Sequence, residues 1–262
     1  MSINIKSNKA SLDWSQIEKD AATHIARVVA DGGTVNDSNV VLELIANLYA
    51  SNVDRTRVWF YGDKDSGVKL SGANVSKWYS VLGASGDMTP TLSTGTVTAG
   101  TSGGRTNCII CAGDAQISTI SRGLVSPETT ILSESRATNA ALRQTMAIVD
   151  NATTLSGPSG PGIIQAGNTV GYRQNGYTSA GGTNVDYATY VDFQRMGYVT
   201  RHADTGEIFV DGVSVANRGV QLAVSPTYSL HYFRIGGLTS AVAVSRAFAF
   251  GGVLRPAQMK AL

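Results

Sequence analysis

Charged residues are scarce in this sequence. They make up 15% of its 262 residues, against roughly a quarter in an average soluble protein. The net charge is +2, and neither a basic run nor a stripe of arginines with aromatics occurs. These absences exclude a coiled coil and a charged, solvated tail. They also leave nucleic-acid binding without support, and we predict no nucleic-acid partner.

Cysteines and long apolar runs are equally scarce. Cys108 and Cys111, the two cysteines, are too few for the disulfide framework of a small secreted domain. No apolar stretch approaches the roughly 20 residues that span a bilayer. The opening residues, MSINIKSNKASLDW, lack the apolar stretch of a signal peptide. We therefore expect a protein that is made in the cytoplasm and does not insert into a membrane.

The first 55 residues show apolar positions at helical spacing. We predict one helix from about Ser15 to Ala30, capped by Asp13 or Ser15, and a second that follows Asp37 or Ser38. Their apolar faces contain, in order, Ile17, Ala21, Ile25, Val28 and Val29, then Val40, Val41, Leu44, Ile45 and Leu48. Such a hairpin is too small to be stable alone. It must pack on the rest of the chain, on copies of itself or on another protein.

From residue 56 onward, short alternating runs separated by Gly, Asn, Asp, Ser and Thr indicate strands. The clearest is Glu207–Ala216, in which Asp211-Gly212 suits a two-residue hairpin turn. The segment Arg136–Val149 is compatible with a helix or with a strand edge. The other predicted strands are Arg57–Tyr61, Val75–Tyr79, Asn107–Ala112, Thr129–Leu132, Thr189–Val199, Leu230–Ile235 and Val242–Phe250. This pattern predicts a mainly β protein, an antiparallel β-sandwich or jelly roll preceded by the short N-terminal helical hairpin.

Four segments resemble concanavalin A-like, laminin-G-like domains: an opening with a Gly turn, a Trp and a Gly-rich loop, a Val-Asp-Gly hairpin, the strand after it, and a closing strand with a short helix. In chain order they are Gly67–Thr91, Thr205–Ala216, Phe233–Gly237 and Ala243–Leu262. In the family the last helix often has an acidic residue where this chain has Gln258. The resemblance implies a jelly-roll domain over residues 56–262 and leaves residues 1–55 as an N-terminal helical docking segment.

A helical prefix before such a domain is similar to the architecture of bacteriophage virion proteins, namely tail fibres, spikes and head-decoration adhesins. In these, a short N-terminal segment docks on the particle and a lectin-like domain faces outward. The resemblance implies other virion proteins as partners through residues 1–55 and a host-surface glycan or receptor as the ligand. It also implies a homotrimer and a location in the virion.

Two short motifs raise the question of a metal. Cys108 and Cys111 have C-x-x-C spacing, but a zinc site needs a second pair or matching histidines, and in a strand the two thiols point to opposite faces. We interpret both as structural. Asp63–Gly67 is similar to a calcium loop, yet Val68 and Asn74 stand where an EF-hand needs Gly and Glu. We predict no metal site and no cofactor, and a looser calcium site, which some relatives have, is left without support.

Catalytic motifs are also missing. Glycoside hydrolases of this fold aim two Glu and an Asp into one cleft from alternating positions of one strand. No such string occurs here, because Glu128, Glu134 and Glu207 are isolated in the sequence. Neither G-x-S-x-G nor H-E-x-x-H is present. We predict that the protein is not an enzyme.

Aromatic residues supply the candidate binding site. Tyr172, Tyr177, Tyr187 and Tyr190 cluster in a polar region rich in Gly and Asn, and Trp78 lies in a predicted strand. Exposed Tyr and Trp rings can stack on sugar rings, whereas half-buried sheet aromatics would only pack. The packing interpretation weighs more for Trp78 than for the tyrosines. We take all five as glycan-binding candidates.

Together these observations predict a phage virion structural protein whose lectin-like domain attaches to a host-surface glycan or receptor. One alternative is a bacterial carbohydrate-binding or adhesion module outside any virion. A second is a structural virion component that binds no ligand. A glycoside hydrolase or lyase of the same fold is a third, and the missing carboxylate string counts against it.

Overall fold

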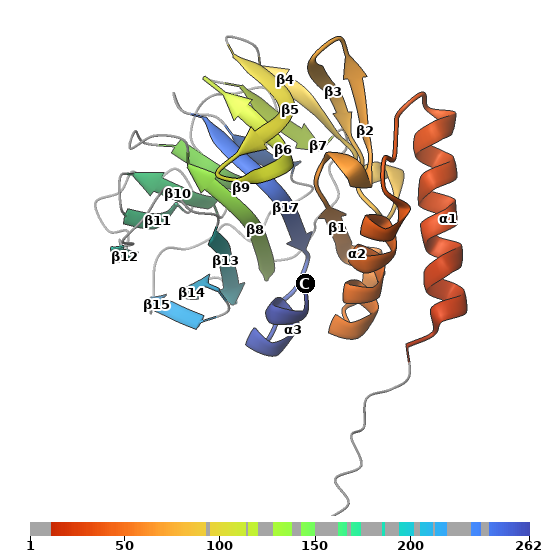
Figure 1. Cartoon of the computed structure of the whole chain (residues 1–262). Helices are drawn as coiled ribbons and strands as arrows, with labels where there is room; N and C mark the ends of the chain where they lie inside the picture. The colour runs from red at the N-terminus through yellow and green to blue at the C-terminus, as the bar shows by residue number, and fades with distance from the viewer. Residues whose placement is uncertain are drawn as a thin grey trace, which may run out of the picture.

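The chain forms a β-sandwich with a helical hairpin on one side (Figure 1). The fold is that of a computed structural model, and the predicted fold class is confirmed. The structure describes residues 12–92, 95–113, 115–119, 128–137, 143–149, 162–166, 169–173, 185–186, 194–201, 205–211, 213–218, 232–236 and 241–262. No helix within these ranges is long and apolar enough to cross a membrane.

The two predicted N-terminal helices are confirmed as α1, Trp14–Ala30, and α2, Ser38–Ser51. Each begins at an aspartate cap: the side chain of Asp13 accepts a hydrogen bond from the Gln16 amide, and that of Asp37 accepts one from the Asn39 amide. These bonds satisfy donors that a helix start leaves free. A third helix, α3, Pro256–Ala261, ends the chain as the sequence indicated.

One detail of the predicted helix face is wrong. Val29 was placed on the buried face of α1, but its side chain is 60% exposed. His24 is buried instead, together with Ile17, Ala21 and Val28. The buried face of α1 differs from the predicted one because the His24 side chain forms a hydrogen bond with the backbone carbonyl of Ser66 on the sandwich. Hydrophobic periodicity by itself does not detect a buried polar side chain of this kind.

Strand pairings divide the sandwich into two layers. The first layer has the order β15-β14-β13-β8-β17, and β17 continues along one half to β6 and β5 and along the other half to β1. Its strands are β1 (Val58–Tyr61), β5 (Thr96–Ser102), β6 (Arg105–Ala112), β8 (Thr129–Ala137), β13 (Gln194–Arg201), β14 (Thr205–Val210), β15 (Val213–Arg218) and β17 (Val242–Phe250).

The second layer has the order β4-β7-β16-β9-β10-β11-β12. Its strands are β4 (Met88–Leu92), β7 (Gln116–Thr119), β9 (Arg143–Val149), β10 (Gly162–Ala166), β11 (Thr169–Arg173), β12 (Val185–Asp186) and β16 (Tyr232–Gly236). The hairpin of β2 (Val68–Ser71) and β3 (Asn74–Trp78) joins the layers, because β3 pairs once with β4 and once with β5. All of the pairings between these described strands are antiparallel.

Two sequence predictions in the strand region are resolved by these pairings. The predicted hairpin is confirmed, since Val210 pairs with Val213 and Asp211 has a φ of +50°, while Gly212 lies outside the described residues. The ambiguous segment Arg136–Val149 contains the end of β8 and the strand β9. It is a strand because β9 hydrogen-bonds to β10 on one side and β16 on the other.

Alternation along β17 produces two apolar clusters, one on each face of the first layer. Val242, Val244, Ala247 and Ala249 face the second layer and belong to the core between the layers. Phe248 and Phe250 face the other way, into a second cluster. That cluster also contains apolar residues of all three helices: Ile17, Ala21, Val41, Leu44, Ile45, Leu48, Met259 and the adjoining Leu262.

The helical hairpin therefore packs on its own sandwich. The predicted boundary near residue 55 separates helices from strands, but the apolar faces of α1 and α2 share one cluster with Phe60 and Phe248. A partner is not needed to bury those faces. Of the three alternatives that the sequence left open for the hairpin, packing on the rest of the chain is the one observed. Docking of residues 1–55 on a particle protein stays a prediction.

Candidate functional site

Trp78 does not offer an exposed ring. It has no solvent exposure and lies in the core between the layers, where its indole N–H donates a 2.9 Å hydrogen bond to the carbonyl of Gly62. Its proposed role in glycan stacking is thus corrected to core packing. Core packing was the preferred interpretation for this residue. It is correct because Trp78 lies on the side of β3 that faces the core between the layers.

The tyrosine candidates are only partly within the described residues. Tyr172 lies on β11, where its Cα pairs with that of Ile163 on β10. Tyr177, Tyr187 and Tyr190 lie outside the described residues. The structure therefore places Tyr172 on the second layer and leaves the predicted tyrosine cluster as a prediction.

The C-x-x-C motif consists of two buried thiols in separate surroundings. Cys111 lies in the core between the layers, and burial raises its pKa to about 12. Cys108 is buried outside that core, and desolvation also raises its pKa. Raised pKa values disfavour the reactive thiolate form. Both side chains fit the structural role that the sequence suggested.

The calcium-like loop is used to tie elements together. Asp63 caps a short 3₁₀ turn, and the two carboxylate oxygens of Asp65 accept hydrogen bonds from the side-chain amides of Asn36 and Asn107. N–H donors thus occupy the oxygens that a cation would need. Across the part of the chain that the structure describes, no three His, Cys, Asp or Glu side chains form a group suited to a metal ion.

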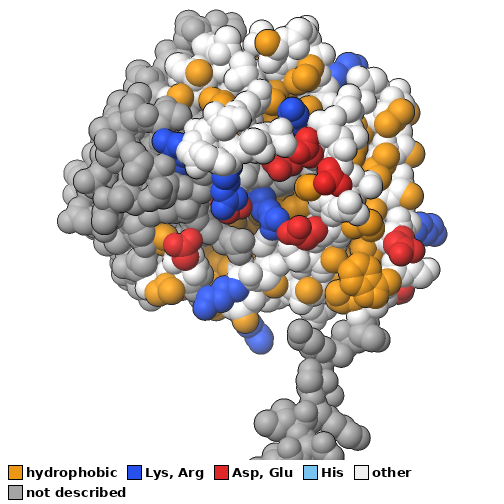
Figure 2. All heavy atoms as spheres, in the orientation of Figure 1, with side chains coloured by type: hydrophobic (Ala, Val, Ile, Leu, Met, Phe, Trp, Pro, Cys, Tyr) orange, Lys and Arg blue, Asp and Glu red, His pale blue; other side chains and the backbone are white. Residues whose placement is uncertain are grey.

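A charged cluster lies on the outer face of the first layer, on the side away from the second layer. We call it the Glu134 cluster and define it by Glu43, Arg105, Glu134, Ser245 and Arg246. These residues come from α2, β6, β8 and β17. Figure 2 shows Lys and Arg side chains beside Asp and Glu side chains across the middle of this face.

Strand register brings the cluster together. Glu134 on β8 is the Cα partner of Arg246 on β17 and of Arg195 on β13, so three neighbouring strands carry charged residues in one row. A bulge between Val244 and Arg246 interrupts the alternation of β17 at this place. Bulges redirect side chains and are frequent next to functional sites. The bulge lets both Ser245 and Arg246 reach acidic side chains.

Each member of the Glu134 cluster is held by a specific contact. Arg105 forms an ion pair with one oxygen of Glu134, and the Ser245 hydroxyl donates to the other oxygen at 3.1 Å. Arg246 pairs with Glu43 at 2.6 Å. The side chains keep different exposures, 45% for Arg105 and 58% for Glu43 but 14% for Glu134. The contacts with Arg105 and Ser245 therefore hold the Glu134 carboxylate in place, while Arg105 and Glu43 remain accessible to solvent.

A small pocket opens beside the cluster. Its apolar floor is formed by Phe60, Leu132 and Phe248, and Glu134 and Arg246 line its polar wall; Ser133, Ala247 and Leu262 complete the lining. Its volume is about 20 Å³, room for about one or two water molecules. A pocket of this size admits one small group, such as a methyl or hydroxymethyl group.

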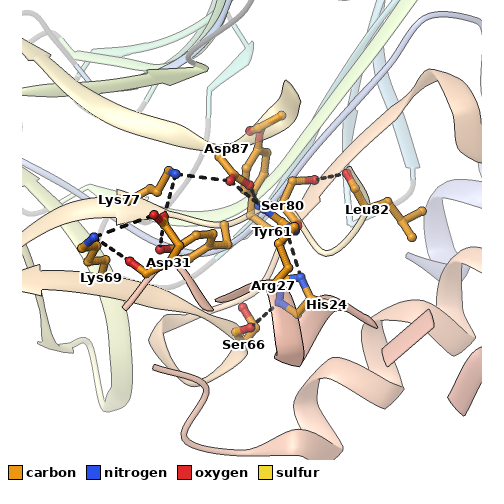
Figure 3. A network of polar contacts seen from close by, with 12 residues as sticks. His24, Arg27, Asp31, Tyr61, Ser66, Lys69, Lys77, Ser80, Leu82 and Asp87 are labelled. Carbon is orange, nitrogen blue, oxygen red and sulfur yellow. Dashed lines mark hydrogen bonds and ion pairs between the residues drawn. The ribbon is translucent and has the colours of Figure 1, made fainter. Parts of the chain in front are cut away.

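A second polar cluster joins α1 to the β2–β3 region (Figure 3). We call it the Arg27 network. Arg27 forms a 2.6 Å ion pair with Asp87 and donates to the Ser80 carbonyl at 2.6 Å. The Ser80 amide donates to the other oxygen of Asp87 at 3.2 Å. Further out, Asp31 accepts from Lys77 at 2.8 Å and from the Tyr79 hydroxyl at 2.6 Å. The contacts of Arg27, Ser80 and Asp87 form a closed set, and they hold α1 against the sandwich.

Burial sets the protonation of the Arg27 network. Desolvation lowers the pKa of His24 to about 4, and the nearby Arg27 charge acts in the same direction. The histidine is thus neutral at pH 7, and its Nε2–H donates to the Ser66 carbonyl at 2.8 Å. Burial raises the pKa of Asp87, against the opposing effect of Arg27. Hydrogen bonds from Lys77 and Tyr79 lower the pKa of Asp31 to about 2.

Glu134 is isolated in the sequence, because Arg105, Ser245 and Arg246 are far away along the chain. The sequence therefore does not predict these neighbours. The alternation of Glu134 and Arg136 with small polar residues in β8 was the available signal. It marks one charged face of a strand but does not say which residues lie opposite.

Comparison with known proteins shows the fold. No protein-family model and no curated protein matches the sequence. Among solved structures, the chain is similar to the binding domain of botulinum neurotoxin DC in complex with rat synaptotagmin II, with a TM-score of 0.53 and 11% identity over 78% of this chain.

Two further structures are similar. One, of botulinum neurotoxin type C, concerns cell entry that depends on interaction with two ganglioside molecules; it has a TM-score of 0.54 and 11% identity over 80% of this chain. The other is the neurotoxin DC binding domain in complex with SialylT, with a TM-score of 0.51 and 13% identity over 79% of this chain. The chain spans about half of each of these proteins, 50% or 51%. At such identities the likeness establishes the β-sandwich fold.

Proposed function

We propose that this protein is a carbohydrate- or receptor-binding module and that the Glu134 cluster is its contact surface. The observation that carries the proposal is the pocket in which an apolar floor meets a charged wall. Sugars have apolar C–H faces and hydroxyl groups that both donate and accept hydrogen bonds. The floor of Phe60, Leu132 and Phe248 is nearly buried and leaves room for one small apolar substituent, and Glu134 and Arg246 suit the hydroxyl groups.

Similar solved structures support a binding role. Two of them are binding domains, in complex with synaptotagmin II and with SialylT, and the third concerns cell entry that depends on interaction with gangliosides. Fold alone does not determine function, so the proposal depends on the site. Within the cluster, Glu134 is held by Arg105 and Ser245. An acceptor fixed in this way suits ligand recognition better than the proton transfer that a hydrolase needs.

Binding to a glycan array followed by titration calorimetry tests this function. We expect the full chain to bind a glycan, and Glu134→Ala and Arg246→Ala each to weaken binding at least tenfold. Lys69→Ala serves as the matched control, because Lys69 also pairs with an acid, Asp31, but lies in the Arg27 network. It should leave affinity unchanged. Absence of binding, or equal loss in all three variants, would overturn the proposal.

The phage setting is a finer proposal that rests on the resemblance of the architecture. In it, the protein is a virion component, forms a homotrimer, and attaches to a host-surface glycan or receptor. Light scattering on the full chain tests the trimer, and mass spectrometry of purified particles tests the location. A monomer that is absent from particles but binds glycans would favour the bacterial adhesion module. A particle component that binds no glycan would favour the structural alternative.

A further inference from the structure

The pocket beside the Glu134 cluster presents an acceptor and a donor that do not neutralise each other. Glu134 on β8 and Arg246 on β17 are Cα partners, and both line the pocket. Each of these charges is nevertheless paired with a different residue, Glu134 with Arg105 and Arg246 with Glu43. A carboxylate and a guanidinium therefore lie next to each other at one wall, each held by its own partner.

Both groups keep hydrogen-bonding capacity. Each oxygen of Glu134 already accepts from a neighbouring side chain, but a carboxylate oxygen can accept more than one hydrogen bond. Arg246 donates to Glu43 at 2.6 Å and to the main-chain oxygen of Leu262 at 3.4 Å, and these contacts do not use up the N–H groups of a guanidinium. Because the Glu134 and Arg246 side chains are 14% and 27% exposed, a ligand at the pocket can contact both.

The remaining lining side chains are apolar and enclose little space. Phe60, Leu132, Phe248 and Leu262 are 1–5% exposed. The volume of about 20 Å³ leaves room for one group of about the size of a water molecule or a methyl group. A hydroxyl group on the apolar floor would be desolvated without a partner there, which costs free energy. The floor therefore favours a methyl group.

We propose that this pocket recognises the acetamido group of an N-acetylated sugar, an inference that rests on the binding function proposed above. An acetamido group combines a methyl group, an N–H that donates and a carbonyl that accepts. The methyl group fills the apolar pocket, the N–H donates to Glu134, and Arg246 donates to the carbonyl oxygen. The N–H and the carbonyl leave opposite edges of the planar amide, so a neighbouring acceptor and donor suit them.

Other sugar substituents match fewer of these features. A hydroxyl group in place of the acetamido group leaves the apolar floor empty. A 6-deoxy sugar supplies a methyl group but neither polar group of the amide. An amino sugar without its acetyl group is a cation, which the Arg246 charge repels. A propanoyl group is one methylene longer than an acetyl group and exceeds the space available.

A matched series of sugars tests the inference on the full chain. The probes are the methyl glycosides of N-acetylglucosamine and N-acetylgalactosamine, which carry the same acetamido group and differ at C4. The comparison sugars are glucose, galactose, N-propanoylglucosamine and the 6-deoxy sugar L-fucose. We expect at least one N-acetylated sugar to bind about tenfold more tightly than all comparison sugars, as expected for one methylene in an apolar pocket. In saturation-transfer NMR, the acetamido methyl protons should receive the largest transfer.

The variant Leu262→Ala tests where the methyl group lies. It widens the pocket, so the affinity for N-propanoylglucosamine relative to N-acetylglucosamine should rise about tenfold. Because both affinities are measured on one protein, a partial loss of folded chain does not change their ratio. Leu70→Ala is the matched control, since Leu70 lies on β2, is 48% exposed and is not part of the pocket. Its ratio should equal that of the natural chain.

The possible outcomes separate this inference from the function on which it rests. Equal binding of N-acetylated and comparison sugars, or tighter binding of L-fucose, would overturn the inference and leave a carbohydrate-binding module. An unchanged ratio in Leu262→Ala, or binding limited to array glycans without acetamido groups, would do the same. Absence of binding to every sugar would overturn both. Should Leu262→Ala fail to fold, the sugar series on the natural chain still decides.

Discussion

The Arg27 network and the Glu134 cluster contain the same kinds of side chain in different surroundings. In the first, Asp87 is 2% exposed and its partner Arg27 is 25% exposed, and backbone groups of Ser80 complete the bonds. In the second, Arg105 is 45% exposed, and its partner Glu134 lines a small pocket. A helix covers one cluster, whereas the other keeps a free side. The comparison teaches that coverage by a helix, rather than residue type, separates the buried ion pair of the Arg27 network from the more exposed ion pairs of the Glu134 cluster.

Removing α1 and α2 should have the largest effect on stability, because it uncovers the side of the sandwich on which the Arg27 network lies. A chain of residues 56–262 lacks seven buried apolar side chains of α1 and α2 and the arginine of the Arg27 network. The six Val, Leu and Ile side chains among them contribute roughly 1.5–3 kcal/mol each, and whole domains have only about 5–15 kcal/mol to lose. We expect this shortened chain to aggregate or to unfold without cooperativity, as followed by circular dichroism. A cooperative transition at the full-length temperature would show that the helices do not stabilise the sandwich.

Single acidic substitutions should separate the two clusters next. Asp87→Ala leaves Arg27 without its buried partner and should reduce the free energy of unfolding by about 3 kcal/mol, the lower end of the range for buried pairs. Glu134→Ala removes a partly exposed pair and should cost about 1 kcal/mol or less. Urea denaturation measures both. Asp87→Asn, which can still accept from the Ser80 amide, is the control and should lose less. Equal losses at the two sites would contradict the comparison.

Acid should weaken the Arg27 network by a smaller amount. The pKa of His24 is lowered to about 4, so between pH 6.5 and 4 the unfolded chain binds a proton there that the folded chain does not. This residue's contribution to stability is therefore lost as the pH falls, by about 2 kcal/mol near pH 5. The raised pKa of Asp87 acts in the opposite direction, because the folded chain takes up that proton first.

Denaturation midpoints from pH 7 to pH 5 measure this effect, with His24→Gln as the matched variant. The groups that face His24 are the backbone carbonyls of Ser66 and Ser80 and the guanidinium of Arg27. The variant should show a flatter pH dependence than the natural chain. The same slope in both would assign the acid sensitivity to other residues.

Much of the fold was predictable because its determinants are local. The capping aspartates, the spacing of apolar residues and the Asp211-Gly212 turn act over a few residues, and each predicted the element that forms there. The segment that contains β9 was ambiguous for the complementary reason. Its strand conformation depends on β10 and β16, which follow it along the chain by up to about 90 residues.

The candidate sites were much less predictable. Trp78 had the composition of a stacking residue and is a core residue, and Glu134 seemed isolated and lies beside three residues from other strands. Each of these outcomes depends on which face of a strand is covered.

The sequence by itself determined the kinds of element, their order and the hairpin turns, because these follow from interactions between residues close along the chain. Only the tertiary structure decided which charges meet and which remain accessible. The register of β17 between β8, β6 and β1 sets Arg246 opposite Glu134, while α1 and α2 close over one part of the outer surface and leave another open. Such contacts join residues more than a hundred positions apart, and their free energy is a property of packing that no local pattern contains.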